Sequence, residues 1–131
     1  MRVLLTGSRG KVGQATSAAL LAAGHRVTGV DVARPTFDRP LPDEPRYQQA
    51  DLTDAGAASA LVRGHDAVVH AAAIPEPTQN AAHTVFGKNL MMTFNLIEAA
   101  VRWGVPRFVN VSSETVPGFF FPERADLPDS V

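Results

Sequence analysis

The stretch that decides the fold is MRVLLTGSRGKVG, residues 1–13. Its first part, Arg2 to Thr6, is a short apolar run that predicts a strand, and glycines follow at positions 7, 10 and 13. From Lys11 to Ala23 apolar residues recur at helical spacing, and Gly24 is placed to end that helix. The stretch therefore predicts a strand, a glycine-rich loop and a helix in succession.

The same alternation continues along the chain. The sequence predicts further strands over 26–31, 46–51, 66–73 and 107–113, a proline-rich loop over 32–45, and helices over 54–62 and 78–103. Such alternation indicates parallel strands joined by right-handed crossovers, with helices on both sheet faces. The predicted fold class is α/β, a doubly wound parallel sheet of the Rossmann type with five strands in the order 3-2-1-4-5.

Two local details of the predicted helices are specific. Thr53 or Asp54 is expected to cap the short helix at its N-terminus. In the long helix, one apolar face is expected to face the sheet. That face comprises Ala82, Phe86, Thr93, Ile97 and Ala100.

Composition narrows the function classes. The chain has 131 residues, 45% of them hydrophobic, and 12 basic against 13 acidic residues give a net charge of −1. This balance lacks the excess of positive charge that is typical of proteins that bind nucleic acid or an acidic membrane. There is no cysteine, so disulfides and zinc–thiolate sites are excluded, and no His and carboxylate cluster has metal spacing. We expect a cytoplasmic protein, because no apolar run reaches membrane-span length and a glycine comes before any signal-peptide core.

The glycine loop predicts a pyrophosphate site. Backbone N–H groups at a helix N-terminus bind phosphate, and a side chain at the turn would block the close approach. The lysine of the loop, Lys11, is not followed by Ser or Thr, so a P-loop is the wrong interpretation. Eighteen residues after Gly13, Asp31 closes the second predicted strand, where a carboxylate can accept from the adenosine ribose hydroxyls.

The choice between NAD and NADP follows from the same residues. A carboxylate at Asp31 would repel a 2′-phosphate, which favours NAD. Arg9 and Arg34 argue the other way, since either could pair with that phosphate; as ordinary solvated arginines they would not. NAD is the expected cofactor, with NADP as the alternative.

At this point the chain resembles the NAD-dependent epimerase/dehydratase family of extended short-chain dehydrogenases/reductases. The Gly7-x-x-Gly10-x-x-Gly13 spacing, the Asp51-Leu52 pair, His70-Ala71-Ala72-Ala73 and the helix around Asn89 and Asn95 carry the resemblance. Met92 stands where the family has glycine, and Pro117 where it has tyrosine. The resemblance implies that the cofactor is bound by Gly7, Ser8, Arg9, Gly10, Lys11, Val12, Gly13, Asp31, Asp51, Leu52, Ala71, Ala72, Ala73, Asn89 and Val111.

The resemblance also implies a catalytic residue. Ser113 aligns with the family's catalytic serine or threonine, whose hydroxyl bonds the reacting sugar hydroxyl or ketone. Its expected place at the carboxyl end of a strand suits a ligand site in an open α/β sheet. The alternative is an ordinary turn serine, with Ser112 as a structural neighbour. Asn89 likewise has two interpretations, a proton-relay residue or a structural amide that is fully hydrogen-bonded.

The family's catalytic Tyr-x-x-x-Lys is not found in the chain. Its single tyrosine, Tyr47, has no lysine four residues later, and Lys11 and Lys88 are the only lysines. We therefore expect the N-terminal portion of a longer enzyme, inactive by itself and lacking the C-terminal strands and substrate domain. Residues 1–118 are the expected dinucleotide-binding domain, and 119–131, with three phenylalanines, an irregular loop leading to the missing part.

The expected function is that of the parent enzyme. It would be an NAD-dependent oxidoreductase or isomerase of the epimerase, dehydratase or uronate dehydrogenase type, acting on a sugar or sugar nucleotide by hydride transfer. A homodimer is expected. The alternatives are a non-catalytic NAD(P)-binding module, or an interaction domain that uses the exposed sheet edge and the phenylalanines.

The four histidines are expected to be structural or solvated. His70 lies inside an apolar predicted strand and is interpreted as a neutral, hydrogen-bonded core residue. His25 and His65 precede strands at turns and are expected to be solvated. His83 lies on a helix face with no metal-ligating neighbour.

Overall fold

A computed structural model describes residues 1–33, 46–75 and 80–113. Residues 34–45 of the loop expected over 32–45, Arg34 among them, and everything after Ser113 lie outside the described residues. The described elements follow the predicted order of strands and helices. They are β1 (Arg2–Thr6), α1 (Lys11–Ala22), β2 (Arg26–Asp31), β3 (Arg46–Gln49), α2 (Ala55–Val62), β4 (Ala67–His70), α3 (Ala82–Arg102) and β5 (Phe108–Asn110).

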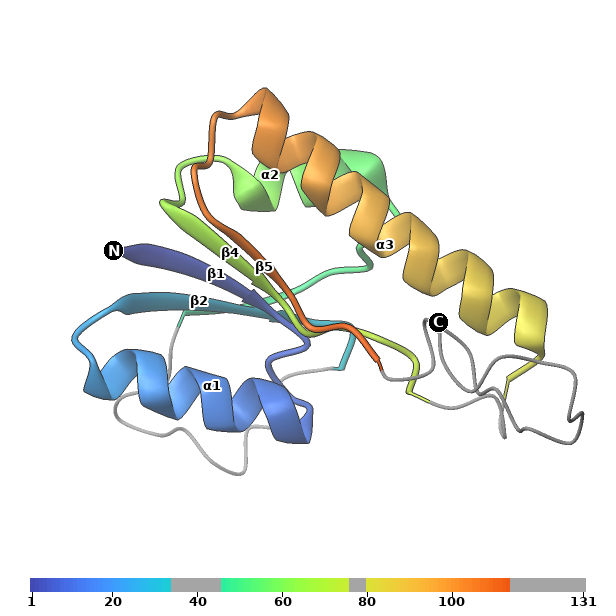
Figure 1. The fold of residues 1–131 in the computed structure, drawn as a ribbon, viewed down its shortest axis with the longest axis horizontal. Coiled ribbons are helices and arrows are strands. Elements are labelled where there is room, and N and C mark those ends of the chain that lie inside the picture. Colours follow the sequence, from blue (N-terminus) through green and yellow to red (C-terminus); the bar gives the residue numbers. More distant parts are fainter. Residues whose placement is uncertain (34–45, 76–79, 114–131) are drawn as a thin grey trace, which may run out of the picture.

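The five strands form one parallel sheet in the order β3-β2-β1-β4-β5. The central strand β1 pairs with β2 on one side and β4 on the other, so that Val3 lies beside both Val27 and Ala67. In Figure 1, α1 covers one face of the sheet, and α2 and α3 cover the other. The predicted doubly wound fold and its strand order are confirmed.

The main core lies between the sheet and the pair α2 and α3. Leu4, Val30 and Val68, from three neighbouring strands, are completely buried there. The helices contribute Val62 and Leu96, also completely buried. Because apolar burial is the dominant favourable term in folding, this layer holds α2 and α3 at a fixed height above the sheet.

Helix ends follow local sequence signals. Asp54 caps α2 by accepting a hydrogen bond from the backbone N–H of Ala57 at 2.9 Å. Gly24 follows α1 with φ +76° and donates to the carbonyl of Leu21. The predicted N-cap at Asp54 and the predicted helix end at Gly24 are both confirmed.

The predicted inner face of the long helix is confirmed only in part: Ala100 is buried, but two of its large side chains are not. Phe86 is 71% exposed and Ile97 45% exposed. The face that packs on the core comprises Met92, Asn95, Leu96, Ala99 and Ala100. The helix carries two apolar stripes, and periodicity does not tell which of them meets the sheet, because both recur at helical spacing.

Three strands, β3, β4 and β5, are also shorter than predicted at their carboxyl ends, whereas β1 and β2 end where predicted. The last pair between β1 and β4 is Thr6 with His70, and Gly7 then turns away with φ +66°. Residues 71–73 follow β4 beyond this last pair, so they were wrongly included in the predicted strand. Their backbone is thereby placed at the edge where ligands of α/β sheets bind.

Candidate functional site

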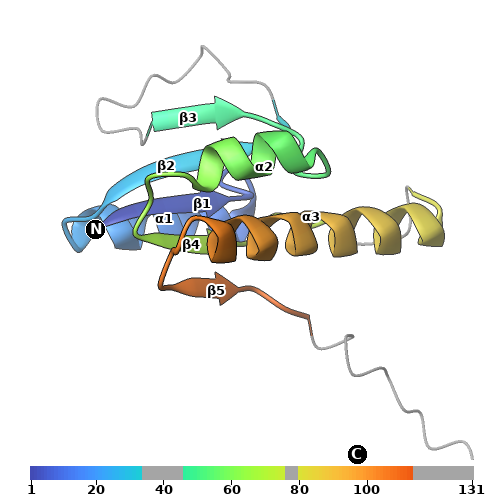
Figure 2. The ribbon, with the colours of Figure 1, turned by 90° about the horizontal axis from the view of Figure 1, so that it is seen from above.

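The sequence-predicted site residues follow the carboxyl ends of all five strands. The glycine loop follows β1, Asp31 ends β2, Asp51 follows β3, and the alanines at 71–73 follow β4. Val111 and Ser113 follow β5. In a parallel sheet these ends share one edge, so residues distant in sequence meet there (Figures 1 and 2).

Two of the loop glycines are required by packing within the protein. A Cβ at Gly7 would lie 2.6 Å from the backbone of Ala71 and Ala72, and the positive φ adds strain. A Cβ at Gly13 would lie only 2.0 Å from the carbonyl oxygen of Gly7. Gly7 therefore allows the loop to pack against the segment after β4, and Gly13 allows α1 to pack against the loop.

Gly10 differs from the other two. Among the residues that the structure describes, a Cβ there would meet only the Gly7 carbonyl oxygen, at 3.3 Å, so its described surroundings are open. It is the N-cap of α1, and among the described residues no side-chain cap bonds the start of this helix. Those N–H groups and the positive end of the helix dipole are available to an anion.

Ser8 lies beside this cradle. Its backbone N–H donates to the carbonyl of Val30 at 3.2 Å. Its hydroxyl oxygen is buried and has no hydrogen-bond partner among the described residues. A buried hydroxyl normally has a partner, so the unpaired Ser8 Oγ and the side-chain-free Gly10 both fit a pyrophosphate at the start of α1.

Asp31 is held in place by backbone donors. Its Oδ2 accepts from the N–H of Arg9 at 3.0 Å, and its Oδ1 from the N–H of Ala33 at 3.2 Å. A carboxylate has about four lone-pair positions, so each oxygen can accept one further bond. The carboxylate is thus fixed against the glycine loop and retains the capacity to accept two ribose hydroxyls.

Tyr47 supports this corner from β3. Its hydroxyl lies within hydrogen-bond distance of the carbonyl oxygens of Asp31 and Ala33, and the guanidinium of Arg9 lies over its ring at 4.6 Å from the centroid. Burial, and then the charge of Asp31, raise the pKa of Tyr47 above its ordinary value. A tyrosine with a raised pKa is a poor base, so Tyr47 is a structural residue at the expected ribose corner.

The Asp51-Leu52 pair is organised from two sides. Asp51 accepts from both the backbone N–H and the hydroxyl of Thr53, which holds the pKa of Asp51 below its ordinary value. The Leu52 side chain is buried in the core, so only its backbone can face a cofactor. The amide of Asn95 donates to the carbonyls of Leu52 and Thr53. Asn95 is a positioning residue that sequence reasoning missed, and its only signal was a polar residue among apolar ones.

A chain of hydrogen bonds centred on His70 lies at the carboxyl ends of β1 and β4. His70 Nδ1 is 2.7 Å from the Thr6 hydroxyl, and Nε2 is 3.1 Å from the Thr93 hydroxyl. Thr93 donates its own hydrogen to the carbonyl of Asn89, so it accepts from Nε2–H. Thr6 then donates to Nδ1 and accepts from the N–H of Ala72 at 3.3 Å. A neutral His70 ring with its proton on Nε2 thus satisfies each of these hydrogen bonds, which agrees with the prediction of a neutral, hydrogen-bonded core histidine.

Acid should therefore weaken the fold through His70. Burial lowers the pKa of His70 from 6.5 to about 4. Between these values the unfolded chain binds the proton and the folded chain does not, so stability is lost as pH falls through this range. The loss by about pH 4 should be roughly 2–3 kcal/mol. Urea unfolding of the full-length protein at several pH values should show it, and a His70→Gln variant should show a flatter acid limb.

Two results would contradict this assignment. One is a ring titration of His70, followed by NMR, with a midpoint near that of free histidine. The other is an acid limb of the unfolding free energy that runs parallel in the wild-type protein and in His70→Gln.

Both groups of the Asn89 amide form a hydrogen bond within the protein. Its Oδ1 accepts from the N–H of Ile74 at 2.8 Å, and its Nδ2 donates to the Ile74 carbonyl at 3.1 Å. These two bonds tie α3 to the segment after β4, next to Ala71, Ala72 and Ala73. The geometry favours the structural interpretation of Asn89, which would then act on the cofactor only through that segment.

Ser113 lies just beyond β5 at the sheet edge. Val111 donates its N–H to the carbonyl of His70 at 2.9 Å, which extends the pairing of β5 with β4 past the strand. Residues 111–113 are exposed. The serine thus follows β5 at the carboxyl end of the sheet, the end at which ligands of open α/β sheets bind.

His65 departs from its expected solvated state. It is half-buried, and its Nε2 lies 3.0 Å from the Thr28 hydroxyl. Burial lowers its pKa below the ordinary value.

Within the described ranges, no group of three His, Asp or Glu side chains could hold a metal ion. Among the same residues, no helix is long and apolar enough to cross a bilayer.

A sequence model of the NAD dependent epimerase/dehydratase family matches residues 3–129. A 3 beta-hydroxysteroid dehydrogenase/Delta 5-->4-isomerase of Mycobacterium tuberculosis is 41% identical over 123 residues, which cover 88% of this chain and 32% of that protein. A uronate dehydrogenase of Pseudomonas syringae pv. tomato is 32% identical, covering 91% of this chain and 42% of that protein.

A solved structure is similar as well. A UDP-glucose-4-epimerase of Stenotrophomonas maltophila, with bound NAD and formylated UDP-arabinopyranose, has a TM-score of 0.77 and 29% identity. The alignment covers 97% of this chain and 40% of that one. The chain thus spans about a third to two fifths of the length of these relatives. NAD, the cofactor expected from the sequence, is the one on which the matched family depends and the one that this epimerase structure contains.

Proposed function

The chain belongs to the NAD dependent epimerase/dehydratase family, and we propose that it forms the NAD-binding and serine-bearing part of an oxidoreductase or isomerase. The observation that carries the proposal is the anion cradle at Gly10 and Ser8, placed beside the backbone-held carboxylate of Asp31. A phosphate cradle and a carboxylate acceptor in this order suit a dinucleotide. The full-length protein is the form to test.

In this proposal the chain's own residues hold the cofactor. The first-turn N–H groups of α1 and the Ser8 hydroxyl bind the pyrophosphate, and Asp31 accepts from the adenosine ribose. Asp51 and the backbone of Leu52 border the adenine, while the backbone at 71–73 lines the path toward β5. Bound NAD supplies the hydride acceptor at its nicotinamide.

Ser113 is the proposed catalytic residue. Its hydroxyl would donate to the reacting oxygen of the substrate and so stabilise charge that develops there. It cannot serve as the base, since an unactivated hydroxyl is a poor one. Tyr47 is bonded at the ribose corner. We therefore expect no turnover from residues 1–131 alone and propose that the rest of the full-length protein supplies the base.

The proposed substrate is the carbinol of a sugar or sugar nucleotide. One relative is a uronate dehydrogenase, and a structural neighbour holds a UDP-sugar. Another relative is a hydroxysteroid dehydrogenase/isomerase, which makes a steroid alcohol the necessary comparison. NADH formation by the full-length protein should be measured with a uronic acid, UDP-glucose and a 3β-hydroxysteroid, and UDP-glucose should also be assayed for epimerisation. Activity with the steroid alone would overturn the sugar assignment, and activity with none would favour a binding module.

Removal of the Asp31 carboxylate should change the choice of cofactor. Asp31→Ala should weaken NAD binding by about 1–3 kcal/mol, because a charge-assisted hydrogen bond to the ribose is lost. NADP binding should weaken less or improve, since a 2′-phosphate no longer meets a carboxylate. Calorimetry with both cofactors measures the two changes. If the wild-type protein already binds NADP more tightly than NAD, the assignment of Asp31 is wrong.

We also propose a homodimer in the cytoplasm. The outer stripe of α3, defined as Phe86, Leu90, Phe94, Ile97 and Val101, consists of apolar side chains that are 45–77% exposed. It runs about 22 Å along the helix. Two copies can pair such stripes about a two-fold axis, because an isologous contact needs only one self-complementary patch. The alternative occupant is the remainder of the same chain.

A charge in this stripe should separate the dimer. Phe94→Glu would bury a carboxylate without a partner at the centre of the contact, so the dimer dissociation constant should rise by at least about 100-fold. Sedimentation of the full-length protein measures it. Lys88→Glu, an exposed charge change on the same helix outside the stripe, is the control. A monomeric wild-type protein would assign the stripe to the rest of the chain.

A further inference from the structure

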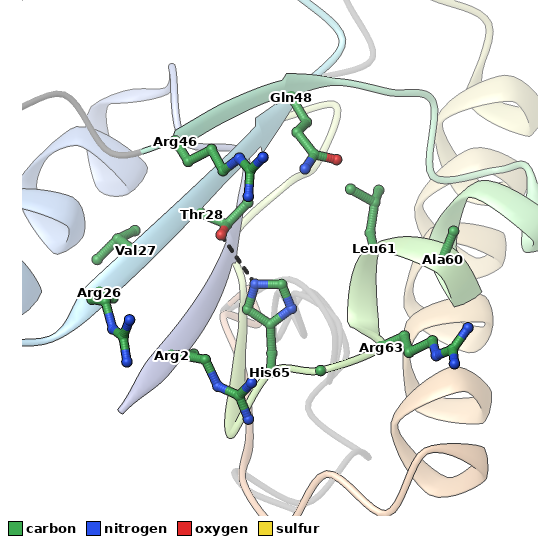
Figure 3. A pocket seen from close by; sticks show the side chains of 11 residues that line it. Arg2, Arg26, Val27, Thr28, Arg46, Gln48, Ala60, Leu61, Arg63 and His65 are labelled. Carbon is green, nitrogen blue, oxygen red and sulfur yellow. Dashed lines mark hydrogen bonds between the residues drawn. The ribbon is translucent and has the colours of Figure 1, made fainter.

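A pocket of about 400 Å³ lies at the edge of the sheet opposite to the proposed NAD site. Arg2, Arg26 and Arg46 are the first residues of β1, β2 and β3, and all three line it. The end of α2 and the turn into β4 close the other side (Figure 3). The parallel strands thus bring three arginines together at their amino ends, far from the glycine loop in the fold.

The described residues that line this pocket include four arginines and no carboxylate. Arg63, after α2, is the fourth arginine in its lining. Arg2 is paired with Asp66 at 2.9 Å, while Arg63 lies over the ring of Trp103. Arg26, Arg46 and Arg63 form no salt bridge with a carboxylate among the described residues. The C-terminal end of α2 offsets only about half a unit charge.

The remaining walls suit a small organic anion. Thr28, Gln48 and His65 supply polar groups, and Figure 3 shows Gln48 and Arg46 directed from β3 into the space above His65. Val27, Ala60 and Leu61 supply apolar surface. The volume lies within the range of small-molecule sites, which combine an apolar lining with a few convergent polar groups.

We propose that this pocket binds a diphosphate group, either free or carried by a small organic molecule. Guanidinium groups bind phosphate oxygens in a bidentate manner. Because Arg26 and Arg46 have no carboxylate partner among the described residues, a ligand with more than one negative charge matches this lining best. A single carboxylate would leave most of this charge uncompensated. The site is separate from the proposed NAD site, so neither assignment depends on the other.

Calorimetric titration of the full-length protein with inorganic pyrophosphate tests the proposal, in the presence of saturating NAD so that the glycine loop is occupied. Pyrophosphate should bind, and its affinity should fall as salt is raised. The double variant Arg26→Gln with Arg46→Gln should raise the dissociation constant by at least about tenfold. The control is Arg102→Gln, an exposed arginine that is paired with Glu98 and lies outside the pocket.

A second measurement uses the wild-type protein and needs no variant. His65 lines the pocket, with a pKa that burial lowers and that Arg2 lowers further. A bound dianion favours the protonated ring, so its NMR titration midpoint should move upward with pyrophosphate. A higher affinity for ADP than for pyrophosphate would indicate an organic diphosphate as the ligand. Equal affinities would indicate the free anion.

Three outcomes would overturn the proposal. They are no binding of pyrophosphate in the presence of NAD, equal binding by the double variant and Arg102→Gln, and an unchanged titration of His65. Citrate bound as tightly as pyrophosphate would show a general anion site instead of a diphosphate site.

Discussion

Gly10→Val in the full-length protein should abolish measurable NAD binding, with a dissociation constant at least about 100-fold above that of the wild-type protein. The valine side chain would occupy the open space before the first turn of α1, where the pyrophosphate is proposed to bind. Loss of two charge-assisted hydrogen bonds of about 1.5–3 kcal/mol each accounts for a change of this size. Calorimetry gives the affinity, and circular dichroism shows whether α1 is retained.

The three glycines of the loop provide the contrast for this experiment. A Cβ at Gly10 meets only one atom, at 3.3 Å, whereas a Cβ at Gly13 would lie 2.0 Å from the Gly7 carbonyl. Gly13→Ala should therefore lower the free energy of unfolding, while Gly10→Val should retain the fold. Gly87→Val, a helix glycine with nothing near its Cβ, is the control for glycine replacement itself. Normal NAD affinity in Gly10→Val would remove the pyrophosphate from this loop.

The sequence was sufficient for the fold because its signals are local and agree with one another. Gly24 ends α1 with the left-handed backbone typical of a glycine C-cap, and Asp54 caps α2. Alternating strands and helices then leave few topologies, because crossovers are right-handed and short. The order of the sheet follows from these rules.

The orientation of α3 could not be predicted for a physical reason. Its sequence places Phe86 and Ile97 on one stripe and Met92 and Leu96 on another, and only the packing against the sheet and α2 selects the second. The exposed stripe carries the larger side chains, so hydrophobicity alone favours the wrong choice. A surface reserved for another partner has the same composition as a core face.

The contacts of the candidate site residues could not be predicted from the sequence. The sequence pointed to Asp31 by its spacing after the glycine loop and left Asn89 with two interpretations. The structure distinguishes them, because Asp31 keeps acceptor capacity while both groups of the Asn89 amide are bonded to Ile74. Asn95 and His65 were missed because their partners, the Leu52 carbonyl and the Thr28 hydroxyl, are remote in sequence.

Ser113→Ala should lower kcat of the full-length enzyme by about 100-fold or more and leave the affinity for NAD unchanged. Removal of one positioned donor to a developing oxyanion costs about 10²–10³ in rate. NAD affinity should persist because the proposed dinucleotide contacts lie at the start of α1 and at Asp31. Steady-state kinetics and calorimetry on the same preparations separate the two effects.

Ser112→Ala is the matched control, one residue earlier at the same exposed end of β5. If the role of Ser113 were only to shape this turn, the two variants would lose similar activity and similar stability. If its hydroxyl meets the substrate, only Ser113→Ala loses kcat, and Ser113→Thr restores part of it because the hydroxyl returns. Normal turnover by Ser113→Ala would reduce the serine to a turn residue and move the search for the donor to the rest of the full-length protein.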